Sequence, residues 1–78
     1  MALITNNKFE RIEKVRNLVH NETQSTYTTF SKYDNKFFQI DTYGSDNRKF
    51  KNKISQSIQL DKNMAIEIIE ILRDEFDL

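Results

Sequence analysis

Apolar and polar positions recur with a helical period at both ends of the chain and alternate with a period of two between them. Near the N-terminus the apolar residues at helical intervals are Phe9, Ile12, Val15 and Val19. Asn7 and Glu10, three residues apart, have the spacing of a capping box. The pattern predicts an amphipathic helix over residues 8–19.

The middle of the chain is rich in Thr, Ser, Tyr and Phe, which favour a half-buried strand over a helix. Residues 25–32 and 37–43 are predicted to form a hairpin, with the turn at Asp34 and Asn35 because both side chains tolerate positive φ. Residues 54–60 alternate again and predict a third strand, which buries Ile54, Ile58 and Leu60 on one side.

The register of the hairpin decides which side chains share a face. A two-residue loop at Asp34 and Asn35 would set Phe30 opposite Gln39. A three-residue loop that includes Tyr33 sets Phe30 opposite Phe38 and Thr28 opposite Ile40, and we favour it. The opposite face then carries Tyr27, Thr29, Phe37, Gln39, Asp41 and Tyr43.

The C-terminal segment predicts a second helix. Asp61 is a good N-cap, and the apolar stripe that follows consists of Met64, Ala65, Ile68, Ile69, Leu72 and Phe76. Ile66 and Ile71 flank this stripe, so the helix has more apolar surface than one sheet face readily covers. Either the N-terminal helix or a second subunit is expected to cover the remainder, with Ile66 and Ile71 as candidate dimer-interface residues.

The elements together predict one small α+β domain over residues 1–78. It has an N-terminal helix, a three- to four-stranded antiparallel sheet, and a C-terminal helix packed on one sheet face. A chain of 78 residues is at the size where a single core is marginal, which also favours a homodimer.

Composition excludes most catalytic and metal chemistry. The chain has no Cys and a single His, His20, so it has no thiolate ligands and no second His to complete a metal site. The carboxylates have no base, nucleophile or metal partner at a diagnostic spacing. We therefore expect no enzyme, no cofactor and no metal. A signal peptide and a membrane span are not expected either, and a cytoplasmic location is the default.

The formal charge is zero but is unevenly distributed. Residues 43–60 contain four basic and one acidic residue, whereas residues 61–78 contain two basic and six acidic ones. The basic residues of the loop are Arg48, Lys49, Lys51 and Lys53. Ordinary solvated faces would give the same asymmetry.

The polar face predicted for the sheet combines three kinds of group. Tyr27, Phe37 and Tyr43 could stack on bases, and the loop cations could neutralise phosphates. Hydroxyls, amides and a carboxylate accompany them in Thr29, Gln39, Asp41, Ser55, Ser57 and Gln59. The combination favours sequence-tolerant binding of single-stranded DNA or RNA. The alternatives are a plain solvent-exposed or helix-covered face, and a face that grips a protein partner, as in an inhibitor or accessory subunit.

The order of elements over residues 25–72, with the runs QIDTY at 39–43 and SIQLD at 57–61, resembles the positive-cofactor-four family of transcriptional coactivators and its bacterial single-stranded-DNA-binding relatives. The resemblance implies a curved antiparallel sheet before the helix, pairing of two subunits through the helical region, and single-stranded DNA held by the sheet side and its loops. It assigns DNA binding to Lys32, Lys36, Tyr43, Arg48, Lys49, Lys51 and Lys53.

Overall fold

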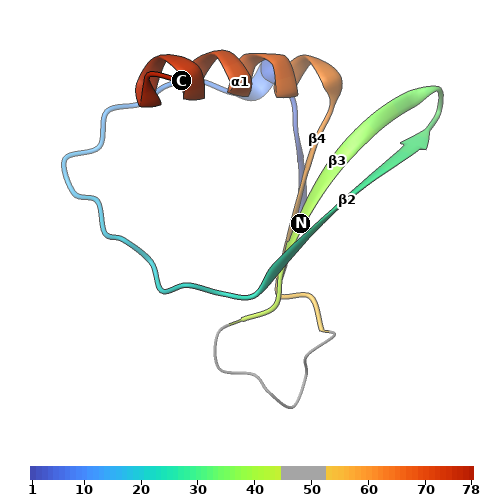
Figure 1. Ribbon diagram of the computed structural model, residues 1–78, viewed down its shortest axis with the longest axis horizontal. Helices are drawn as coiled ribbons and strands as arrows, with labels where there is room; N and C mark the ends of the chain where they lie inside the picture. The colour runs from blue at the N-terminus through green and yellow to red at the C-terminus, as the bar shows by residue number, and fades with distance from the viewer. Residues whose placement is uncertain (45–52) are drawn as a thin grey trace.

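The computed structural model describes residues 1–44 and 53–78 and shows an α+β chain with a four-stranded mixed sheet and one C-terminal helix (Figure 1). The elements are β1 (Ala2–Ile4), the 3-10 turn η1 (Asn6–Lys8), β2 (Ser25–Lys32), β3 (Asn35–Thr42), β4 (Gln56–Leu60) and α1 (Lys62–Phe76). The strand order in the sheet is β1-β4-β3-β2, with β1 parallel to β4 and the other pairs antiparallel.

The hairpin between β2 and β3 confirms two predicted strands but not their register. Lys32 pairs with Asn35, so the two-residue loop consists of Tyr33 and Asp34, with φ of 55° and 61°. Positive φ at both loop residues is the requirement of a type I′ turn, whose twist matches that of the strands. The favoured three-residue loop over residues 33–35 was one residue too long, because Asn35 already pairs with Lys32 as the first residue of β3.

The register therefore sets Phe30 opposite Phe37, not opposite Phe38. One side of the sheet, called here the polar face, carries Leu3, Thr26, Thr28, Phe30, Lys32, Phe37, Gln39, Asp41, Tyr43, Ser57 and Gln59. The other side, the apolar face, carries Tyr27, Phe38, Ile40, Ile58 and Leu60, together with Thr29 and Lys36. The correction moves Tyr27 and Thr29 away from the face that the sequence analysis gave them.

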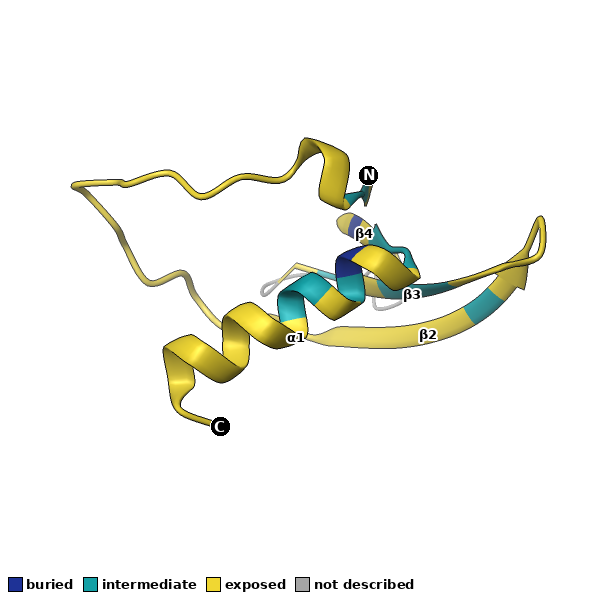
Figure 2. Cartoon of the chain, turned by 90° about the horizontal axis from the view of Figure 1, so that it is seen from above, coloured by how far each residue is buried: buried dark blue, intermediate teal, exposed yellow. Residues whose placement is uncertain are grey.

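Helix α1 forms as predicted. Asp61 caps its first turn, since the Asp61 Oδ1 accepts a hydrogen bond of 2.9 Å from the Met64 backbone N–H. Ala65 lines a pocket together with Phe38 and Leu60, which places the start of the helix on the apolar side of the sheet. Among the described residues, Met64 is the one buried hydrophobic side chain. Burial decreases along the helix, and Phe76 in its last turn is 69% exposed (Figure 2).

The predicted N-terminal helix over residues 8–19 is absent. The chain makes the short turn η1, closed by a 3.1 Å hydrogen bond from the Lys8 N–H to the Thr5 carbonyl, and then continues without helix or strand to β2. This connection, residues 9–24, forms a wide exposed arch and is called the arm below (Figures 1 and 2). A helix of about a dozen residues is marginal in water without packing for its apolar side. In this chain Val15 and Val19 are 99% and 101% exposed, so that packing is missing.

Strand β1 is the element that the sequence analysis did not predict. Its three residues pair in parallel with β4, Ala2 opposite Ile58 and Ile4 opposite Leu60, so the expectation of a purely antiparallel sheet was wrong. A strand of three residues is too short to be recognised from the alternation of apolar and polar residues. The third predicted strand begins at Gln56, and Ile54 lies before it. No helix in the described part of the chain is long and apolar enough to cross a membrane.

Candidate nucleic-acid interface

Two phenylalanine rings form a stacked pair on the polar face. Phe30 and Phe37 are directly opposite each other on β2 and β3, and their rings stack with centroids 5.4 Å apart and planes inclined by 28°. Both side chains are half-buried, so part of each ring remains in contact with solvent. Lys32 lies farther toward the hairpin tip, with its Nζ 5.5 Å from the centroid of the Tyr33 ring. The polar face thus carries a partly exposed aromatic pair, with a cation farther along β2 near the hairpin tip.

A chain of side-chain hydrogen bonds crosses the polar face next to these rings. The Gln59 Nε2 donates to the Gln39 Oε1 at 2.7 Å, and the Gln39 Nε2 donates to both carboxylate oxygens of Asp41 at 3.0 and 3.1 Å. These hydrogen bonds form because Gln39 and Asp41 are two residues apart on β3, so their side chains share a face, and Gln59 on β4 lies directly opposite Gln39. Asp41 is 6% exposed, so its carboxylate is buried, whereas its donor Gln39 is half-buried.

Tyr43 extends the polar face just beyond the end of β3. Its hydroxyl shares a 2.8 Å hydrogen bond with the Thr26 hydroxyl, and its backbone N–H donates to the Gln24 carbonyl at 3.0 Å. The position of the ring is fixed by one hydrogen bond at its hydroxyl and one from the backbone N–H of the same residue. Tyr43 is therefore a held aromatic group, not a mobile surface residue.

The structure brings four of the predicted site residues onto one face: Lys32, Phe37, Gln39 and Tyr43. Tyr27 and Lys36 lie on the apolar face because of the corrected register, and the Tyr27 ring stacks on Phe38 with centroids 5.6 Å apart. Lys53 is exposed ahead of β4. Arg48, Lys49 and Lys51 lie outside the described residues.

Phe30 and Thr26 are polar-face residues that sequence reasoning missed. Both follow from the two-residue turn at Tyr33 and Asp34, and the signal that could have revealed them is the pairing of one aromatic with another, Phe30 with Phe37. The favoured three-residue loop paired Phe30 with Phe38 instead, because Phe37 and Phe38 are adjacent and alternation alone does not distinguish them.

The predicted interface residues of α1 are both accessible. Ile66 is 47% and Ile71 40% exposed. The end of the helix that carries Ile71 is exposed throughout (Figure 2).

No cluster of three or more His, Cys, Asp or Glu side chains suited to a metal ion occurs within residues 1–44 and 53–78. No family profile, curated protein or solved structure matches the chain.

Proposed function

We propose that the protein binds single-stranded nucleic acid, with DNA favoured, through the polar face of its sheet and without catalysis. The observation that carries the proposal is the alignment of Phe30, Phe37 and Tyr43 on one face beside the Gln59–Gln39–Asp41 chain. Sequence-tolerant binding of single strands rests on base stacking over aromatic side chains, combined with cations that follow the backbone.

The hydrogen-bond chain gives its members different roles in this proposal. The amide N–H groups of Gln39 are directed at Asp41, so Gln39 positions the carboxylate and does not read bases. Gln59 is the outer end of the chain, and one of its amide N–H groups remains for a base edge. Because the Gln39 amide binds both oxygens of Asp41, the buried carboxylate points to a protein donor and away from the phosphates of a bound strand.

Phosphate neutralisation would come from the two ends of the polar face. Lys32 stands at the hairpin tip, and Lys53 precedes β4 at the other end of the sheet. Arg48, Lys49 and Lys51 are close to Lys53 in sequence and add to the positive charge of that loop. Lys36 lies on the apolar face and is not part of the proposed site. The resemblance of residues 25–72 to the positive-cofactor-four family adds a reason to favour DNA.

We also propose that two chains associate through the apolar surface of α1, around Ile66 and Ile71. The single chain exposes 7622 Å². A folded monomer of 9.4 kDa is expected to expose about 5,000 Å². A second copy is the simplest means of covering the excess, and it would double the number of polar faces per particle.

The proposal is tested by fluorescence anisotropy with labelled single-stranded and duplex oligonucleotides. The matched variants are Tyr43→Leu on the polar face and Tyr27→Leu on the apolar face. Tyr43→Leu should weaken single-strand binding about tenfold, within the range for one lost base–aromatic stack. Tyr27→Leu should leave the affinity unchanged. The affinity should fall by about 0.7 log units per log unit of salt for each phosphate contacted.

Two results would contradict the proposal. One is an absence of single-strand binding at low salt. The other is an equal loss of affinity in the two tyrosine variants, because the polar face would then have no special role. Salt-insensitive capture of a protein by the same face would favour the alternative of a protein-binding module.

A further inference from the structure

The arm has the sequence of an amphipathic helix but lacks a surface to pack on. Its apolar residues recur at helical spacing, yet Ile12, Val15, Leu18 and Val19 are all exposed. The arm leaves the body of the protein beside α1 and passes through solvent before it reaches β2 (Figures 1 and 2). The apolar side chains of residues 12–19 are therefore left largely exposed to solvent in the single chain.

Helix α1 also exposes apolar residues, but its charge has the opposite sign. Its exposed apolar residues are Ile66, Ile69, Ile71, Leu72 and Phe76. Residues 67–77 also carry five acidic side chains and one basic one, whereas residues 8–19 carry four basic and two acidic ones. The arm and α1 are thus complementary both in apolar periodicity and in charge.

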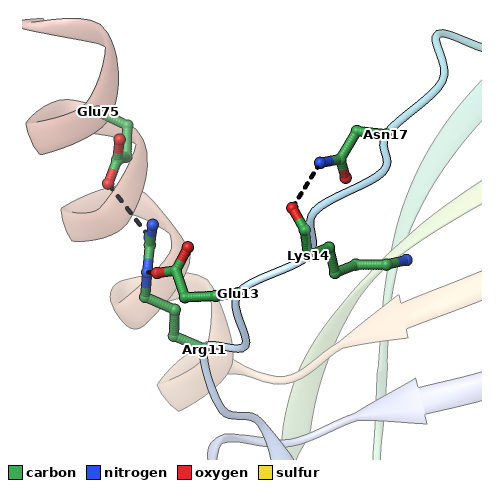
Figure 3. Close-up of polar contacts among 5 residues, drawn as sticks. All are labelled: Arg11, Glu13, Lys14, Asn17 and Glu75. Carbon is green, nitrogen blue, oxygen red and sulfur yellow. Dashed lines mark hydrogen bonds and ion pairs between the residues drawn. The ribbon is translucent and has the colours of Figure 1, made fainter.

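One contact between these two segments already exists at the base of the arm. The Arg11 Nη1 lies 3.5 Å from the Glu75 Oε1, and the Arg11 Nε lies 2.9 Å from the Glu13 Oε1 (Figure 3). Phe9 lines a shallow pocket together with Glu67 and Ile71. The Glu67 Oε2 is buried without a hydrogen-bond partner among the described residues, so a further donor is needed there.

The direction of the arm disfavours packing of residues 12–19 against the helix of the same chain. Phe9 and Arg11 line one pocket with Ile71 and Glu75, and the Arg11 Nη1 lies 3.5 Å from the Glu75 Oε1 near the end of α1. From this point the chain runs toward the C-terminal end of the helix (Figure 1). Helix α1 ends at Phe76, and the arm runs past that end before it turns toward β2 (Figures 1 and 2). To reach Ile66 and Ile69 in the same chain, the arm would have to reverse at once. The α1 surface of a second copy requires no reversal.

We infer that residues 12–19 of each chain, which follow the contacts of Phe9 and Arg11 with their own helix, fold into a helix on α1 of a second copy, so that two chains exchange their arms. This inference rests on the dimer proposed above. Basic side chains of the arm then face the acidic side of the partner helix, and Val15 and Val19 cover its apolar stripe. The missing N-terminal helix is, on this view, a helix that forms only on association.

The absence of native cysteine allows a clean crosslinking test. A chain with Val15→Cys and a second chain with Ile69→Cys are mixed and treated with a bismaleimide, whose reach tolerates a one-turn difference in register. The matched control replaces Val15→Cys by Asn17→Cys, on the opposite side of the predicted arm helix. We expect a covalent heterodimer with Val15→Cys and its loss with Asn17→Cys. Val15 is fully exposed, so the substitution should not disturb the sheet.

A second readout uses unmodified protein without nucleic acid. The helical circular-dichroism signal per residue should rise with protein concentration in step with the mass measured by sedimentation. Val15→Asp should abolish this rise, and Asn17→Asp should retain it. A monomeric mass at all concentrations would overturn both the dimer and the arm exchange. A dimeric mass with no Val15 crosslink, or with only an intrachain crosslink in the double-cysteine chain, would overturn the arm exchange alone.

Discussion

At the scale of single residues, Gln39 connects the buried carboxylate of Asp41 to the rest of the polar face. Asp41 pairs with Ser57 across the β3–β4 ladder, and both are buried. The Gln39 amide donates to both oxygens of the Asp41 carboxylate. A buried charged acceptor without a donor is costly, so Gln39 should matter for stability as well as for the shape of the proposed site.

Replacing Gln39→Ala should lower the free energy of unfolding by about 1–3 kcal/mol, because the Asp41 carboxylate would lose its donor. Replacing Gln59→Ala removes one neutral hydrogen bond from a half-buried amide and should cost about 0.5–1.5 kcal/mol. Urea titrations at one fixed protein concentration would measure both. A larger loss for Gln59→Ala than for Gln39→Ala would mean that the carboxylate does not depend on Gln39.

At the scale of elements, the hairpin turn sets the composition of both sheet faces. Tyr33 and Asp34 have positive φ, whereas Asn35 already belongs to β3 and its Nδ2 donates to the Tyr33 carbonyl at 3.0 Å. A glycine is favoured where φ is positive and disfavoured within a strand. The two neighbouring positions should therefore respond in opposite directions to the same substitution.

Asp34→Gly should leave the free energy of unfolding unchanged or raise it by up to about 1 kcal/mol, since glycine adopts positive φ without a steric penalty. Asn35→Gly should lower it by about 0.5–1 kcal/mol, because a strand residue would become glycine. Thermal or urea unfolding of the two variants would compare them. The reverse order of stability would place Asn35 in the turn and contradict the pairing of Asn35 with Lys32.

The two predicted helices show how far sequence patterns reach. Helix α1 was predictable because its determinants are local: the Asp61 cap, fifteen helical residues, and a first turn that buries Met64. The arm has the same periodicity, but its helix depends on a surface that the single chain does not provide. In the same way, alternation predicted β2 and β3, but the register followed from the conformation of Tyr33. What depends on packing partners or on one turn residue was not predictable.

The candidate site was partly predictable for the same reason. Residues of β3 and β4 keep their faces whatever the hairpin register, so Phe37, Gln39 and Gln59 were placed correctly on one face. The contribution of β2 depends on the register, so Tyr27 was misplaced and Phe30 was missed.

At the scale of the whole molecule, the single chain is more open than a folded domain of its length. Its radius of gyration is 14.7 Å, compared with about 11–12 Å for a compact domain of 78 residues. The excess comes with the exposed arm and the uncovered half of α1. Both features are exposed in the single chain, and a second copy would cover both and leave the polar face accessible to a ligand.

The most direct test of the account is a chemical-shift titration of the aromatic and side-chain amide resonances with a short single-stranded oligonucleotide. If the polar face binds the oligonucleotide, the largest changes occur at Phe30, Phe37, Tyr43 and the Gln59 amide, and the resonances of Tyr27 and Phe38 on the apolar face remain unchanged. Changes concentrated at Tyr27 and Phe38, or no changes on either face, would contradict the proposal that the polar face binds single-stranded nucleic acid.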